Sequence, residues 1–359
     1  MKNTYDRIVI VRIGRDMYMK KNKKKKEQAK KRRLLLSLLL LVGTGIFLGT
    51  STYAWFTANQ TVAVNPIDVN VATQSGLQIS ADGQNWKSIL TTTDITSASG
   101  TYADAKNQLP TQMVPVSSAG IMNADGTMEM FLGEVSSDED SGNFVLAATK
   151  ETDANGTTGN YVVYDMFLRT ESAGPVYLTT NSGITFADDQ DNGLKNATRV
   201  AFAVLGNTTS DDDIENIQDL NAGVAAPVTI WEPNMDAHTS YGVANARDTY
   251  GNGDLVAGTG NDPVAYDGIK LGFGTEQGIT LGNANATEAG TYFQAVTPKI
   301  QTEVGFSEYK ELVNLSKGVT KIRVYFWVEG QDVDCENNAS GGNITFNLQI
   351  SRNASADGA

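Results

Sequence analysis

The chain has 359 residues, among them 28 Lys and Arg, 41 Asp and Glu, one His and one Cys, and its formal net charge is −13 at pH 7. An acidic chain repels the phosphate backbone, so a nucleic-acid-binding protein is not expected. A single His excludes a zinc protease with two imidazole ligands, and a single Cys excludes an intramolecular disulfide framework.

A basic segment followed by an apolar one marks the N-terminal part of the chain. Ten basic residues lie within 20–33, and an apolar, Leu-rich run of 17 residues follows at 34–50. With small residues at Thr52 and Ala54, this pattern predicts an export signal that is cut between Ala54 and Trp55 by a signal peptidase. The alternative is a retained membrane anchor, because 17 apolar residues are just enough to span a bilayer. Either way, the protein meets the membrane only through residues 34–50.

The charge of the exported part differs from that of the whole chain. Residues 55–359 hold 14 basic and 38 acidic residues, which gives a formal charge of −24. We therefore expect residues 1–54 to form a cytoplasmic basic segment with the signal or anchor, and residues 55–359 to form a soluble domain outside the cell or at its surface. Such an acidic surface can also collect divalent cations.

Strand patterns recur along the exported part, whereas helical periodicity is scarce. The clearest are an alternating segment at 67–71, an apolar run at 198–205, and two C-terminal segments at 322–328 and 344–350 around a polar loop. Weaker strand patterns lie at 77–79, 161–168, 176–178 and 228–231. The best short helix candidate is 307–312, and the Gly- and Asp-rich segments 136–160 and 211–298 are expected as insertions that form surface loops or short hairpins. These elements predict an all-β fold, a two-sheet antiparallel sandwich of jelly-roll type.

Candidate chemistry is limited to one acidic loop. Asp332, Asp334 and Glu336 place oxygen ligands at alternate positions, the type of ligand that Ca²⁺ prefers. The alternative is a solvated acidic loop. Cys335, in the same loop, is either a small buried side chain or the partner in an intersubunit disulfide. No catalytic role is expected, since His238 is isolated in a polar segment.

The residues at the two ends resemble a known family. The stretch Thr52-Tyr53-Ala54-Trp55-Phe56, a Thr/Asn/Val-rich first strand, and the C-terminal strands joined by 329–335 are similar to the TasA/camelysin family of Firmicutes exported proteins. The long middle region does not share in the resemblance. The resemblance implies a jelly-roll subunit of an extracellular biofilm matrix, matured by a dedicated signal peptidase that cuts after Ala54. It also implies a homo-oligomeric fibre, in which the N-terminal strand of one subunit completes the sheet of the next.

An N-terminal strand of this kind can be donated on physical grounds as well. Backbone hydrogen bonds would supply affinity, and alternate side chains would set the register. Head-to-tail donation does not close on itself and therefore grows a fibre. The apolar residues of the predicted donor strand are Val62, Val64, Ile67, Val69 and Val71. The alternative is that this segment is the first strand of its own sandwich. The second functional class left open is a membrane-tethered surface module that binds carbohydrate or a cation.

Overall fold

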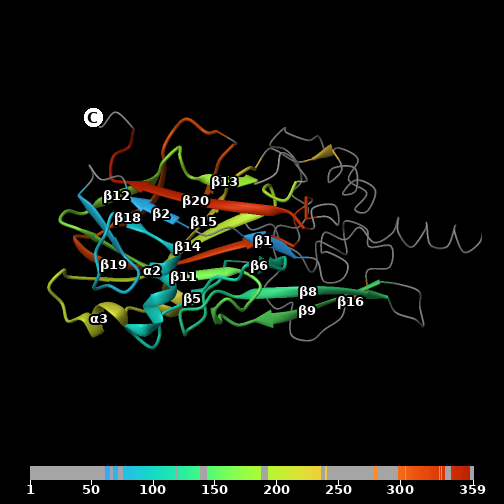
Figure 1. Cartoon of the computed structure of the whole chain (residues 1–359), viewed down its shortest axis with the longest axis horizontal. Helices are drawn as coiled ribbons and strands as arrows, with labels where there is room; N and C mark the ends of the chain where they lie inside the picture. Colours follow the sequence, from blue (N-terminus) through green and yellow to red (C-terminus); the bar gives the residue numbers. More distant parts are fainter. Residues whose placement is uncertain are drawn as a thin grey trace, which may run out of the picture. The chain divides into compact units, whose positions relative to one another are not determined.

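Figure 1 shows a computed structural model of the chain. The described residues belong to the unit Thr52–Ala359 and are 61–64, 68–71, 76–118, 120–137, 144–186, 193–235, 239–240, 279–280, 298–303, 305–330, 332, 334–335 and 341–355. The predicted signal with Ala54 and Trp55, and also Ile67, His238 and Glu336, lie outside the described residues.

The described residues form an all-β protein, as the sequence predicts. An eight-stranded sheet, here called the central sheet, has the order β10-β5-β11-β19-β14-β15-β17, with β3 also paired to β11. Its three longest strands are antiparallel neighbours in the order β11, β19, β14. The strands are β3 (Leu77–Ser80), β5 (Asn107–Gln108), β10 (Asn155–Gly156), β11 (Val162–Thr170), β14 (Thr198–Thr208), β15 (Val228–Glu232), β17 (Ile300–Gln301) and β19 (Gly318–Val328).

A second eight-stranded sheet, here called the terminal sheet, contains the first and last described strands. Its order is β18-β12-β20-β1-β6, with β13 and β2 also paired to β20 and β4 paired to β2. The strands are β1 (Val62–Val64), β2 (Asp68–Val71), β4 (Ile89–Leu90), β6 (Gln112–Met113), β12 (Gly174–Leu178), β13 (Gly183–Phe186), β18 (Lys310–Leu315) and β20 (Asn343–Ser351).

A smaller sheet and a few short helices complete the described part of the chain. The four-stranded sheet has the order β16-β9-β8-β7, from Ile279–Thr280, Phe144–Glu151, Met130–Ser137 and Val116–Ser117. The helical segments are α2 (Thr92–Ser97), η2 (Ala98–Gly100), α3 (Ile214–Gln218) and η3 (Gly223–Ala225).

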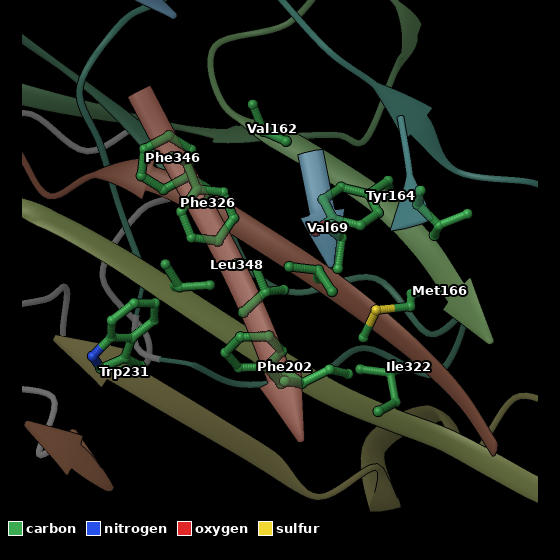
Figure 2. Packing of buried hydrophobic residues seen from close by; sticks show 14 of the residues in the cluster. Val69, Val162, Tyr164, Met166, Phe202, Trp231, Ile322, Phe326, Phe346 and Leu348 are labelled. Atoms are coloured by element: carbon green, nitrogen blue, oxygen red, sulfur yellow. The ribbon is translucent and has the colours of Figure 1, made fainter. Parts of the chain in front are cut away.

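The main core lies between the central and terminal sheets. Alternate residues of β11 and β19, such as Tyr164 and Phe326, point into one buried cluster that also holds Phe346 and Leu348 of β20. Figure 2 shows this packing, in which the rings of Phe326 and Phe346 stack with centroids 4.9 Å apart. This cluster makes the pair of sheets a sandwich-like unit.

The central sheet is buried on its other face too. Val163, Ala203 and Tyr325 pack there with Val116 of β7 and Met130 of β8 in a second cluster. A strand covered on both faces needs apolar residues at nearly every position. This explains why 198–205 and 322–328 are almost continuous apolar runs, and it confirms the predicted strands there.

Several finer expectations need correction. The segment 307–312 is not helical, because strand β18 pairs with β12 and buries Leu312 and Leu315. Within the predicted insertions, β9 pairs with β8 as a hairpin, and β15, which confirms the weaker strand pattern at 228–231, belongs to the central sheet. The sheets are mixed rather than antiparallel, since β1 and β2 run parallel to β20.

Candidate functional site

The N-terminal strand lies along the C-terminal strand. Ala63 of β1 is the register partner of Asn343, and Val69 of β2 is that of Leu348, both in parallel pairing with β20. Backbone hydrogen bonds join the start of this strand to the chain just before β20, from Ala63 N to Gly342 O at 2.9 Å and from Gly341 N to Thr61 O at 3.1 Å. The first described strand is therefore fixed to the last.

The register changes by one residue between β1 and β2. Three residues separate Val64 from Asp68, whereas two separate their partners Ile344 and Asn347. In an uninterrupted strand, residues at an odd spacing point to opposite faces. The one-residue change puts Val62 and Val69 on the same face, and both are fully buried in the main core.

Short strands flank the N-terminal strand on its other side. β1 is antiparallel to β6 through Val62 and Met113, and β2 is antiparallel to β4 through Val69 and Leu90. Both β4 and β6 are two residues long. The nine-residue β20 therefore supplies most of the regular backbone pairing. The N-terminal strand thus lies between β20 on one side and β4 and β6 on the other. We call this position in the terminal sheet the strand seat.

The two valines join the strand to the core beneath it. Figure 2 shows Val69 among side chains from β11, β19 and β20, including Tyr164 and Leu348. Burying a valine contributes about 1.5–3 kcal/mol. The predicted donor residues Val62 and Val69 are thus buried in the strand seat of their own domain, whereas Val64 and Val71 are placed here only as members of β1 and β2.

One polar group in this core has no partner. The Tyr164 hydroxyl is fully buried and makes no hydrogen bond. Burial raises the pKa of Tyr164 and keeps the phenol neutral. An unsatisfied buried hydroxyl costs about 1–3 kcal/mol, so Tyr164 weakens the core that holds the N-terminal strand.

In the acidic loop that sequence reasoning singled out, the two described acids, Asp332 and Asp334, already have protein partners. The Asp332 carboxylate pairs with Arg199 at 2.7 Å, and Arg199 also pairs with Glu232 at 2.8 Å. Asp334 accepts hydrogen bonds from the backbone and hydroxyl of Thr239 at 2.9 and 2.7 Å. A guanidinium on Asp332 disfavours a second cation at the same oxygens.

Among the described residues, no three His, Cys, Asp or Glu side chains are grouped closely enough to hold a metal ion. Glu336 lies outside that part of the chain, so the predicted set cannot be assembled from Asp332 and Asp334 alone. Sequence reasoning missed Arg199, whose one signal is a charged residue beside the apolar run that forms β14.

Cys335 and two of the tryptophans lie in the interior. Cys335 is fully buried in the main core, out of reach of another chain in this conformation. Trp231 and Trp327 are buried as well, so neither offers an exposed ring to a sugar. Trp86 is half-buried and carries the Arg169 guanidinium over its ring at 4.2 Å.

The fold and the strand seat define an all-β sandwich-like protein whose first strand is held beside its last. Comparison with protein-family models, with curated proteins and with solved structures found no match. In the part of the chain that the structure describes, no helix has the length and apolar character needed to cross a membrane.

Proposed function

We propose that this protein is a structural subunit of an extracellular filament, exported from the cell and assembled by donation of its N-terminal strand to a neighbouring copy. In this proposal the seat of one subunit holds the β1–β2 strand of another. The subunit is a jelly-roll-type, non-catalytic component of a biofilm matrix, and it associates with further copies of itself after a signal peptidase has cut after Ala54.

The observation that carries the proposal is the way the N-terminal strand is held. It precedes every other described element, pairs with β20 over both its halves, and contributes Val62 and Val69 to the core. A strand at the start of the fold can leave without unthreading any later element. An identical strand from another copy would make the same hydrogen bonds and fill the same two apolar positions.

In the structure the strand occupies the seat of its own domain, the self-complemented state that donation has to displace. Both states bury the same valines, so exchange changes few contacts. The unsatisfied hydroxyl of Tyr164 lowers the stability of the core beneath the seat by the same amount in both states. The formal charge of −24 on residues 55–359 opposes close approach of subunits, and salt screens that repulsion.

Disulfide trapping tests the exchange directly. Two differently tagged copies, both Cys335→Ala, carry Ala63→Cys and Asn343→Cys respectively and are exported by the same cells. These positions are register partners and half-exposed, and strands about 4.8 Å apart allow a disulfide. Donation predicts a disulfide between differently tagged copies, and a ladder of oligomers when one chain carries both cysteines.

The matched control replaces Asn343→Cys by Gln349→Cys, six positions further along β20 and equally half-exposed. It should give no cross-link with Ala63→Cys. If the double variant closes only within its own chain while mixed copies stay separate, the strand remains in its own domain and the proposal fails.

Export is tested by sequencing the N-terminus of protein from the cell surface, together with negative-stain microscopy of the same fraction. A start at Trp55 with long fibres supports the filament. An intact segment at 20–33 in a membrane-bound fraction without fibres instead supports the tethered binding module.

A further inference from the structure

A polar cavity of about 450 Å³ opens on the face of the central sheet that points away from the terminal sheet. Its walls include Lys321 and Arg323 of β19, Lys106, and three acidic residues from separate loops, Asp104, Asp125 and Asp219. The cavity lies outside the strand seat and plays no part in the proposed strand exchange. Its volume is within the range of about 300–1,000 Å³ found for small-molecule sites.

Two buried cations line the floor of this cavity. Lys321, Arg323 and Asp165 are 3 %, 4 % and 1 % exposed. Arg323 donates to both Asp165 oxygens, at 2.7 and 3.1 Å, and to the Gly126 carbonyl at 2.8 Å. Asp165 is the acid that pairs with both buried cations, closely with Arg323 and at longer range with Lys321.

Asp165 has little capacity left for Lys321. It also accepts from the Tyr102 hydroxyl at 2.9 Å and from the Lys106 backbone at 3.3 Å, while Lys321 Nζ stays 3.7 Å away. Lys321 donates to the Gln218 carbonyl, a neutral acceptor. Burial lowers the pKa of Lys321, although the Asp165 charge acts in the opposite direction. An anion entering the cavity would therefore stabilise an ammonium group that burial removes from water.

The outer walls have the opposite charge. Asp104, Asp125 and Asp219 are all exposed, whereas Lys321 and Arg323 are buried. A simple anion would be repelled at this acidic opening, and a simple cation would be repelled by the floor. A molecule that carries both charges, with the negative group leading, is complementary to the whole cavity.

We propose that this cavity binds a small zwitterion of the amino-acid or short-peptide class. The carboxylate of the ligand accepts a charge-assisted hydrogen bond from Lys321, and its ammonium group lies among Asp104, Asp125 and Asp219. Lys106, half-buried on the wall, adds a second positive charge near the carboxylate.

Calorimetric titration of the exported protein with three related probes tests the charge pattern. L-Lysine carries both groups, hexanoate lacks the ammonium groups, and cadaverine lacks the carboxylate. The expected result is that L-lysine binds at least about tenfold more tightly than either other probe, the effect of losing one charge-assisted interaction. Equal binding of hexanoate, tighter binding of cadaverine, or no heat with any probe would overturn the proposal.

Two variants locate the bound probe. Lys321→Met should weaken L-lysine binding about tenfold or more, and Asp219→Asn should weaken it several-fold. Asp211→Asn, an exposed acid outside the cavity, is the matched control and should bind as the unmodified protein does. If Lys321→Met fails to fold, the half-buried Lys106→Gln replaces it. If neither Lys321→Met (or Lys106→Gln in its place) nor Asp219→Asn changes the affinity for L-lysine, the proposed site is contradicted.

Discussion

The guanidinium of Arg199 in β14 lies 2.7 Å from the Asp332 carboxylate, across 133 positions of sequence. Arg199 also pairs with Glu232 of β15, and all three side chains are 2 % exposed or less. The loop after β19 is thereby fixed to the central sheet by a buried ion pair, where sequence reasoning considered a calcium site or a solvated acidic loop.

Replacing Arg199 should be strongly destabilising. Arg199→Met keeps much of the side-chain volume but leaves the Asp332 and Glu232 carboxylates buried without their shared cation. Losing one partner of a buried pair costs about 3–5 kcal/mol. Urea unfolding followed by tryptophan fluorescence measures this, with Arg169→Met, at a half-buried position near the end of β11, as a milder control. Equal losses for the two variants would contradict a structural role for the Arg199 pair.

A charge at position 69 should separate donation from acceptance. Val69→Asp places a carboxylate at a fully buried position of the strand seat. In the filament proposal such a subunit accepts a strand but cannot donate one. Mixing the variant protein with wild-type protein should therefore shorten the fibres in proportion to the fraction of variant subunits. Fibre lengths from negative-stain images measure the effect. Asn70→Asp, at the half-exposed neighbouring position, should leave fibre length unchanged. Fibres of full length from Val69→Asp alone would rule out donation through this seat.

Removing the unpartnered hydroxyl in the main core should stabilise the protein. Tyr164→Phe deletes a buried oxygen that has no hydrogen bond and keeps the ring. We expect the free energy of unfolding to rise by about 1 kcal/mol. Tyr325→Phe is the matched control, because that hydroxyl donates to Asp153 at 2.9 Å and accepts from Met128 N at 2.9 Å. The control should lose about 1–2 kcal/mol. A loss of stability in Tyr164→Phe would mean that its hydroxyl is hydrogen-bonded.

Asp153 should make stability fall as pH rises. Burial raises the pKa of Asp153, although the Tyr161 and Tyr325 hydroxyls donate to it at 2.7 and 2.9 Å and act in the opposite direction. The folded protein therefore binds this proton more tightly than the unfolded chain. The stabilisation is fully present below the unfolded value of 3.8 and is lost as pH rises through the folded value.

Asp153→Asn removes this titration. Relative to wild type, the variant should therefore gain stability between pH 3.5 and pH 7, measured by urea unfolding at several pH values. Glu171→Gln, at an exposed carboxylate after β11, serves as the control. If the difference in the free energy of unfolding between Asp153→Asn and wild type does not change with pH, the raised pKa of Asp153 is refuted.

The long strands could be predicted because the pattern of apolar residues that indicates their burial lies within one continuous segment of the sequence. Residues 198–205 and 344–350 show, respectively, the continuous and the alternating patterns that two-sided and one-sided burial require. The segment 307–312 was wrongly predicted as a helix because its local preference is helical. In the structure, pairing with β12 buries Leu312 instead. Tertiary contacts override such weak local preferences.

The candidate site was predictable in part. Val62 and Val69 were identified from their apolar character, but the one-residue register change that puts both on one face depends on β20, far away in sequence. The Arg199 pair and the cavity at Lys321 are likewise built from positions more than a hundred residues apart. No local pattern records such long-range contacts.

The parallel course of the N-terminal strand beside β20 gives the sheet a direction. The chain enters the terminal sheet next to Asn343 and runs alongside β20 to Ile350. A filament assembled through this pairing has two unlike ends, one with a vacant seat and one with a spare strand. Its growth is therefore polar, and a blocked seat and a blocked strand stop elongation at opposite ends.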